Sequence, residues 1–195
     1  RAEKLVYASD GKEAIVDGTN GFIILQPDED TVGKYNEIMK ENREFSNSLM
    51  RLKGKMTVTK DGREVRLYAN ISNPYDVENV LENDASGIGL FRSDFLFLKD
   101  RDYPSEEEQY LSYRKVVEEM NPRSVIIRTV DIGSDKSVPY LHLPDEENPA
   151  LGMRAIRISL TRKDFFKTQL RALLRASAYG NMRIIFPMIT SLAEL

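Results

Sequence analysis

Cationic side chains follow two short apolar segments, and they are the residues in this sequence best suited to bind a ligand. Arg92 comes directly after 87–91, and Arg128 lies toward the end of 124–130. Lys136 lies in the segment just beyond. A guanidinium group can donate to two phosphate or carboxylate oxygens at once, and a lysine adds a mobile positive charge. If the two segments are neighbouring strands, the three cations suit a small, highly anionic ligand.

Structural salt bridges are the alternative interpretation of the same residues. Asp94, Asp131 and Asp135 lie close to the cations in the sequence, and arginines at strand ends often pair with carboxylates in neighbouring loops. The residue types alone do not decide between an anion-binding site and a set of ion pairs.

Other motifs that carry chemistry are absent or weak. His142 is the only histidine and lies between prolines and leucines, so we expect it to have a structural or surface role. One histidine cannot form a two-histidine metal site, and His142 lies beside no cluster of serine or carboxylate residues that would indicate a Ser-His-Asp triad. Gly87, Gly89 and Gly133 indicate close backbone approach or unusual dihedral angles near a ligand. No nucleotide-binding glycine motif occurs.

Composition excludes several classes of function. The 195 residues include 28 Lys+Arg and 31 Asp+Glu, a formal charge of −3, so general affinity for nucleic acid is not expected. The absence of cysteine excludes disulfides and thiolate chemistry within this stretch and fits a reducing compartment. The apolar runs are too short to cross a membrane. We therefore expect a cytoplasmic protein.

Apolar periodicity predicts the elements that must position the cations. Apolar residues alternate from 5 to 25 around Asp-Gly and Asn-Gly dipeptides, which indicates strands joined by turns. From 31 to 53 they recur every three or four positions before Gly54, which predicts one amphipathic helix. That helix fits equally well as a connector between domains or as a surface helix packed on one domain.

After Gly54 the sequence alternates between strands and helices. Strands joined through helices predict a parallel sheet, so the fold class is α/β. Four such units fit an open doubly wound sheet or the first half of an eight-stranded barrel, and both bind ligands at the carboxyl ends of the strands. The predicted order is a hairpin with arms 56–59 and 63–71, a helix from Pro74, a strand at 87–91, a helix from Ser105 to Met120, a strand at 124–130, a short helix near 151–160, a helix at 163–179 and a strand at 182–189.

The two ends of the sequence indicate a fragment. It begins with Arg1 inside an alternating segment. Ser191 and Glu194 have the capping-box spacing that starts a helix, and the sequence stops at Leu195. We therefore expect both boundaries to be truncated.

Several segments resemble one protein family in order and spacing. The chain resembles the enzyme I family, the phosphoenolpyruvate-protein phosphotransferases of the bacterial sugar phosphotransferase system, over essentially its whole length. The segments that carry the resemblance are 87–97 (GIGLFRSDFLF), 104–109 (PSEEEQ), 127–136 (IRTVDIGSDK), 139–144 (PYLHLP), 146–157 (EENPALGMRAIR) and 185–189 (IFPMI).

The resemblance implies a domain organisation. Residues 1–26 would be the C-terminal tail of a swivelling phosphohistidine domain, and 27–55 a linker helix. Residues 56–195 would be the N-terminal half of a phosphoenolpyruvate-binding (βα)8 barrel of the TIM type, with about four βα units.

The resemblance also assigns ligand-binding roles. Arg92 and Arg128 match the arginines that grip phosphoenolpyruvate, and Lys136 and Arg154 match further ligand-contacting positions. The family uses Mg²⁺. Its metal ligands, its acceptor histidine and its cysteine proton donor would lie outside this sequence, so we expect no catalytic or metal-binding residue here and no turnover by the fragment alone.

The implied reaction is phosphoryl transfer from phosphoenolpyruvate to a histidine of the same protein and onward to a histidine-containing phosphocarrier protein. The arginines would neutralise the transferring group. The whole protein would be a homodimer that neither inserts into a membrane nor binds nucleic acid.

The sequence departs from the family pattern at a few positions, which affects the expected ligand geometry. Ser134 replaces a second glycine, Ser93 and Asp94 replace Thr-Glu, and Met153 replaces an aromatic residue. Two alternatives remain open. One is a barrel of the pyruvate phosphate dikinase or phosphoenolpyruvate synthase type, and the other is a non-catalytic binding module.

Overall fold

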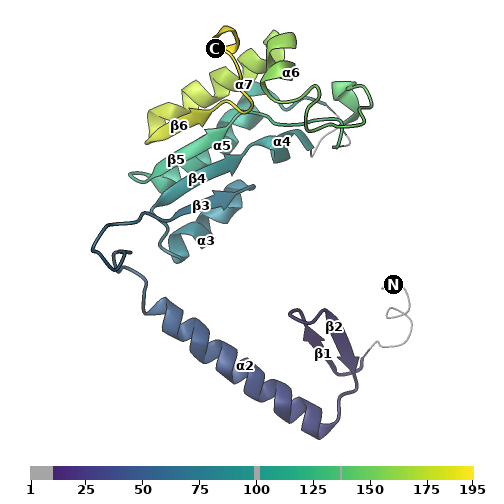
Figure 1. The fold of residues 1–195 in the computed structure, drawn as a ribbon, viewed down its shortest axis with the longest axis vertical. Helices are drawn as coiled ribbons and strands as arrows, with labels where there is room; N and C mark the ends of the chain where they lie inside the picture. Colours follow the sequence, from purple (N-terminus) through teal and green to yellow (C-terminus); the bar gives the residue numbers. More distant parts are fainter. Residues whose placement is uncertain (1–10, 99–101, 137) are drawn as a thin grey trace. The chain divides into compact units, whose positions relative to one another are not determined.

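The computed structural model describes residues 11–98, 102–136 and 138–195 (Figure 1). The chain divides into two compact units, 1–53 and 54–195. Each unit has its own secondary structure, and the cations singled out from the sequence all belong to the second unit.

The first unit contains an antiparallel hairpin of β1 (Ala14–Asp17) and β2 (Phe22–Leu25). Asp17 closes its turn, because one carboxylate oxygen accepts from the backbone N–H of Asn20 at 2.8 Å. The other oxygen accepts from the Tyr35 hydroxyl at 2.9 Å and ties the hairpin to the helix that follows. The predicted strands are therefore confirmed from residue 11 onward, and the part from Leu5 to Asp10 lies outside the described residues.

The helix that follows is α2 (Glu29–Met50). Asp28 caps it by accepting from the backbone N–H of Thr31 at 2.8 Å. The predicted end at residue 53 is three residues too late, because 51–54 form turns in which Gly54 has a φ of +75°. None of the helix residues is buried. Its interpretation as a connector stays a prediction.

The second unit contains a four-stranded sheet in the order β3-β4-β5-β6. Its strands are β3 (Tyr68–Ile71), β4 (Gly87–Arg92), β5 (Ser124–Arg128) and β6 (Met182–Ile185), and all neighbours are parallel. The predicted α/β class with a parallel sheet is confirmed. Strands β5 and β6 end earlier than predicted, at Arg128 and Ile185.

The predicted hairpin at 56–71 is confirmed near its turn but not along the rest of its second arm. Val58 and Glu64 form an antiparallel bridge, and backbone hydrogen bonds on either side of it join 57 with 65 and 59 with 63. The end of its second arm, β3, pairs instead with β4 in parallel. Alternation of apolar residues predicts a strand and its two faces, but it carries no information about which partner strand it will find.

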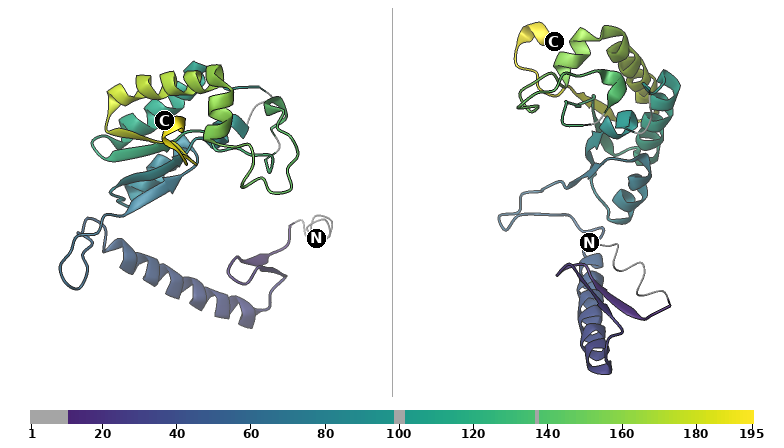
Figure 2. Two further views of the ribbon diagram at one scale, coloured as in Figure 1. Left: turned by 45° about the horizontal axis from the view of Figure 1, so that its top comes forward. Right: turned by 90° about the vertical axis from the view of Figure 1, so that its right-hand side faces the viewer.

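Three helices cover one face of the sheet: α3 (Val77–Glu82), α5 (Glu106–Met120) and α7 (Lys163–Ala176). Figures 1 and 2 show them on the same side, and α5 packs against both α3 and α7. The capping box that predicts the start of α5 is present, since Glu108 accepts from the Ser105 N–H at 2.7 Å. The predicted helix from Pro74 begins with the short 3-10 turn η1 (Pro74–Asp76), which leads into α3. The predicted helix at 163–179 ends with the 3-10 turn η3 (Ser177–Tyr179), which follows α7.

The main core lies between these helices and the sheet. Its strand residues include Ile88, Phe91, Val125 and Ile127, all fully buried. Side chains alternate along a strand, so Arg92 and Arg128 lie on the opposite face. That face is more open, and it carries Tyr68 and Ile185 with 42% and 39% of their surface exposed.

The segments after the strands form the carboxyl-terminal side of the sheet (Figure 1). They include α4 (Asp94–Leu98), η2 (Pro139–Leu141) and α6 (Ile156–Thr161). A second apolar cluster anchors the long segment after β5, and its buried members are Phe97, Val130, Ile132, Val138 and Leu141. The chain ends in η4 (Leu192–Glu194), where the predicted capping box of Ser191 and Glu194 is present.

Candidate anion-binding site

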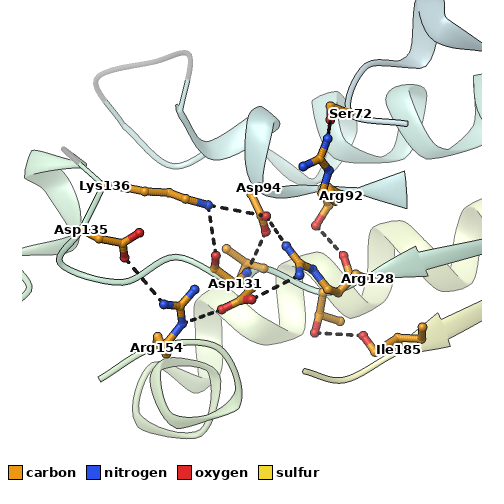
Figure 3. A network of polar contacts seen from close by, with 12 residues as sticks. Ser72, Arg92, Asp94, Arg128, Asp131, Asp135, Lys136, Arg154 and Ile185 are labelled. Atoms are coloured by element: carbon orange, nitrogen blue, oxygen red, sulfur yellow. Dashed lines mark hydrogen bonds and ion pairs between the residues drawn. The ribbon is translucent and has the colours of Figure 1, made fainter. Parts of the chain in front are cut away.

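The two predicted strand-end arginines are neighbours in the sheet. Arg92 ends β4, Arg128 ends β5, and they are register partners in the parallel pairing. Register partners lie on the same face of a sheet. Both side chains therefore leave the carboxyl edge of the sheet on the face opposite the helices. In Figure 3 Arg92 points toward Ser72, and Arg128 points toward Asp94 and Asp131.

Arg128 is held by two carboxylates. Its Nη2 lies 2.5 Å from Asp94 Oδ2, and its Nη1 lies 3.2 Å from Asp131 Oδ2. Its side chain is only 20% exposed. The Nε of Arg128 is buried, and no atom of the described residues accepts a hydrogen bond from it. Buried donors without a partner are uncommon.

Asp94 is the centre of the cluster. Its side chain is 2% exposed, and its Oδ1 accepts from the backbone N–H of Asp131 at 2.8 Å. The Nζ of Lys136 lies 3.7 Å from its Oδ2, the oxygen that Arg128 also contacts. One buried carboxylate thus joins the end of β4 to the end of β5 and to the loop that carries Lys136.

Arg154 completes the cluster from the segment before α6. Its Nε lies 2.9 Å from Asp131 Oδ1, and its Nη1 lies 3.7 Å from Asp135 Oδ1. The hydrogen bond that Arg154 donates to Asp131 raises the pKa of its guanidinium. A Cβ at Gly133 would lie 2.7 Å from Asp135 Oδ1, so a larger residue there would displace the carboxylate that faces Arg154.

Arg92 differs from the other three cations. Its Nη2 donates to Ser72 Oγ at 2.6 Å, and its guanidinium lies 5.8 Å from the centre of the Phe95 ring. It is exposed. No carboxylate pairs with it in the described part of the chain, so its charge is available to a ligand without breaking an ion pair.

The charges of the cluster nearly balance. Its four cations and three carboxylates leave one formal positive charge, and the members are Arg92, Arg128, Lys136 and Arg154 with Asp94, Asp131 and Asp135. Three of the four cations therefore form salt bridges, as the alternative interpretation of the sequence predicts, and among the described residues Arg92 is the exception. An anion with two or more charges would bind Arg92 directly. Its remaining oxygens would replace carboxylate oxygens as partners of the paired cations.

Two parts of the site were missed by sequence reasoning. Ser72 follows β3 directly, but the assignment of 63–71 to a hairpin arm does not reveal that a strand of the parallel sheet ends there. Asp94 was recognised only as a possible ion-pair partner, although its position two residues after the end of β4 signals an inward-facing group at the carboxyl edge.

The other sequence candidates have structural roles. His142 is exposed at the end of η2, with a φ of +44°, and its backbone N–H bonds Pro139. Close approach at Gly87 and Gly89 is confirmed, but the approaching groups belong to the sheet. A Cβ on Gly87 would lie 2.5 Å from Ser124 O, and one on Gly89 would lie 2.9 Å from Tyr68 Cβ.

No metal centre is formed by the residues that the structure describes. Within 11–98, 102–136 and 138–195, no group of three or more acidic or histidine side chains could hold a metal ion. The carboxylates of Asp94 and Asp131 are instead occupied by cationic side chains. In the same ranges no helix has the length and apolar character needed to cross a membrane.

Comparison with known proteins shows the family to which this chain belongs. The profile described as "PEP-utilising enzyme, PEP-binding domain", where PEP is phosphoenolpyruvate, matches residues 46–195. This range contains all of the residues of the cation cluster.

Curated relatives with the name phosphoenolpyruvate-protein phosphotransferase are similar to almost the whole chain. The protein from Priestia megaterium is 50% identical over 184 residues, 94% of this chain and 32% of its own length. The protein from Bacillus subtilis is 48% identical over 186 residues, again 94% and 32%. The Listeria innocua protein is 46% identical over 193 residues, 98% and 34%. This chain spans about a third of their length. The chain therefore belongs to the family of PEP-utilising enzymes, and the resemblance to enzyme I that its motifs predicted is confirmed.

Proposed function

We propose that the protein containing this chain is a phosphoenolpyruvate-protein phosphotransferase, the first component of the sugar phosphotransferase system. It would transfer the phosphoryl group of phosphoenolpyruvate to one of its own histidines and then to a histidine-containing phosphocarrier protein. The observation that carries the proposal is the gathering of Arg92, Arg128, Lys136 and Arg154 at the carboxyl edge of β4 and β5. The names of the curated relatives agree with it.

Phosphoenolpyruvate fits the electrostatics of this cluster. It is a small molecule with a phosphate and a carboxylate, and the cluster contains one exposed arginine, Arg92. Beside it is Arg128, whose two carboxylate partners are shared with Lys136 and Arg154. The two guanidinium groups would hold the ligand, with Lys136 and Arg154 contributing charge around it.

The chemistry asked of these residues is charge neutralisation. In the proposed reaction the bond between phosphorus and the enol oxygen breaks, a bond from phosphorus to a histidine nitrogen forms, and the enolate of pyruvate is then protonated. Cations that contact the phosphoryl oxygens lower the barrier to in-line transfer. We place the acceptor histidine and the proton donor outside this chain, which would not turn over alone.

Mg²⁺ is part of the proposal only through residues elsewhere in the protein. It would add positive charge beside the phosphate. The described carboxylates do not suit it, because Asp94 and Asp131 are already bound by Arg128, Lys136 and Arg154. We therefore assign no ligand of Mg²⁺ to this chain.

We further propose that residues 56–195 are the first half of a (βα)8 barrel. Support comes from the sequential strand order and from helices on one face only, since a doubly wound sheet carries helices on both faces. The more open face, with Tyr68 and Ile185, would then face the barrel interior. Residues 27–55 would be the linker helix, and 1–26 the tail of a swivelling phosphohistidine domain.

The remaining parts of the proposal concern the whole protein. We propose that it is a homodimer and that it works in the cytoplasm. Its partners would be phosphoenolpyruvate and the phosphocarrier protein. These assignments rest on the family resemblance.

The test is a calorimetric titration of phosphoenolpyruvate with Mg²⁺ into the full-length protein and its Arg92→Ala variant. Arg63→Ala is the matched control, because Arg63 is also exposed but lies in the segment before β3, outside the cation cluster. We expect binding in the wild type and the control, and loss of binding in Arg92→Ala. The wild-type protein should also be phosphorylated on a histidine by phosphoenolpyruvate and Mg²⁺ without any nucleotide. A requirement for nucleotide would indicate the dikinase alternative, and no binding would indicate a non-catalytic module.

A further inference from the structure

A fully buried amide lies beneath the cation cluster, on a helix that contributes nothing to the cluster itself. Gln169 of α7 has no exposed surface. Its Oε1 accepts from the backbone N–H of Val130 at 3.1 Å. Its Nε2 donates to Ser93 Oγ at 3.2 Å and to Tyr113 OH at 3.0 Å. Every N–H and the oxygen of this amide are therefore used.

The two segments that Gln169 binds are those that carry the site. Ser93 stands between Arg92 and Asp94, and Val130 stands between Arg128 and Asp131. The β5 ladder ends at Arg128, so the amide of Gln169 gives the Val130 N–H an acceptor where the sheet no longer does. The Gln169 side chain thus provides a hydrogen bond just beyond the end of β5, in the segment that carries Asp131.

Ser93 connects this amide to Arg128. Its hydroxyl accepts from Gln169 and donates to the Arg128 carbonyl oxygen at 2.6 Å. A hydroxyl has one proton to give, so these two bonds fix its orientation. The backbone of Arg128 is thereby tied to the residue that follows Arg92 and to helix α7.

The second branch of the network fixes the orientation of Gln169. Tyr113 OH accepts from Gln169 and donates to Gln109 Oε1 at 3.3 Å, and Gln109 Nε2 donates to Pro104 O at 2.9 Å. Burial raises the pKa of Tyr113, so the phenol keeps its proton and remains a donor. Each donor has one acceptor, and only one orientation of the Gln169 amide satisfies all of them.

We propose that Gln169 is a positioning residue that sets the placement of Arg128 relative to Arg92 and so controls the affinity of the site for phosphoenolpyruvate without touching it. The inference rests on the proposed function. Burying an amide among apolar side chains has a cost that only complete hydrogen bonding offsets. An apolar side chain of the same size would fill the space, but it would leave the Val130 N–H without an acceptor and would remove the donor that fixes the orientation of the Ser93 hydroxyl.

The experiment measures the KM for phosphoenolpyruvate, kcat and the thermal midpoint of the full-length protein. The variants are Gln169→Met, which keeps the length of the side chain, and Ser93→Ala. Leu173→Ala is the control, because Leu173 is equally buried one turn along α7 but belongs to the apolar core. We expect Gln169→Met and Ser93→Ala each to raise KM about five- to tenfold, with little change in kcat. Leu173→Ala should lower the thermal midpoint without this rise.

Two further variants separate positioning from stability. The double variant Gln169→Met/Ser93→Ala should raise KM no more than the more severe single variant, because both changes break one chain of bonds. Ser93→Thr keeps the hydroxyl and should restore a KM near that of the wild type. Should Gln169→Met fail to fold, Ser93→Ala and Ser93→Thr test the same connection.

The outcomes distinguish this inference from the proposed function. Wild-type protein that is not phosphorylated by phosphoenolpyruvate overturns both. Wild-type activity with an unchanged KM in Gln169→Met and Ser93→Ala overturns the positioning role alone, whatever the thermal midpoints. Additive effects in the double variant also contradict it, because they would show that the two residues act separately.

Discussion

Arg92 and Arg128 are register partners at the ends of adjacent strands, yet only Arg128 is paired with carboxylates. Arg128 is fixed between Asp94 and Asp131, whereas Arg92 donates to the uncharged Ser72 hydroxyl. The same residue type in equivalent positions therefore has two roles. One arginine contributes to the stability of the strand ends, and the other keeps an accessible charge.

Removing the side chain of Arg92 should reduce ligand binding without reducing stability. We expect Arg92→Ala to weaken phosphoenolpyruvate binding to the full-length protein by more than tenfold, because a charge-assisted hydrogen bond contributes about 1.5–3 kcal/mol. The thermal midpoint should stay within about 1 °C, since an exposed arginine bonded to one hydroxyl adds little. Calorimetric titration and a thermal scan measure the two quantities. A large drop in the thermal midpoint would contradict the assignment of Arg92 to the ligand.

Removing the side chain of Arg128 should reduce stability as well. In Arg128→Leu the buried carboxylate of Asp94 keeps only Lys136 at 3.7 Å as a charged partner. Loss of one partner of a buried ion pair costs about 3–5 kcal/mol, because the other charge stays buried. Thermal unfolding of the full-length protein measures the effect.

The double variant Arg128→Leu/Asp94→Leu supplies the control for that prediction. It removes both charges, so its thermal midpoint should lie above that of Arg128→Leu. Recovery should be incomplete because the Asp131 N–H loses its acceptor. A double variant less stable than Arg128→Leu would contradict the prediction, because it would show that the unpaired carboxylate of Asp94 is not what destabilises Arg128→Leu.

The sequence predicted the strand-end cations well because their positions follow from local pattern. Arg92 and Arg128 come at the ends of apolar segments, and the parallel sheet then makes them neighbours. Partners were harder to predict, because they depend on which strand lies beside which. Ser72 could not be recognised while β3 was assigned to a hairpin. Gln169 lies 39 residues from Val130 and inside a helix whose other features are those of an ordinary amphipathic segment.

Glycine at position 87 is required by its neighbours in the sheet. A Cβ there would lie 2.5 Å from the Ser124 carbonyl oxygen and 2.7 Å from the Tyr68 ring. The backbone oxygen cannot move aside cheaply, so Gly87→Ala should cost about 1–3 kcal/mol through overpacking. Gly33→Ala is the control, because that glycine lies in α2 with open space around it. It should stabilise the helix by up to about 1 kcal/mol. Equal thermal midpoints for the two variants would contradict the prediction.

The capping carboxylate of α5 should make the start of this helix sensitive to acid. The Ser105 hydroxyl and N–H bond Glu108 and lower its pKa below the ordinary value of 4.5. A carboxyl group whose pKa is lower in the folded state stabilises that state fully above its unfolded pKa, and this contribution is lost as the pH falls through the folded pKa. Hydrogen exchange in the first turn of α5 should therefore be faster in Glu108→Gln than in the wild type at about pH 7. The difference should persist down to about pH 4.5 and shrink below it. Glu147→Gln, in the exposed segment before α6, should leave exchange in α5 unchanged. A difference that disappears well above pH 4.5 would mean that the folded pKa of Glu108 is raised, and that the capping box does not hold the charged form.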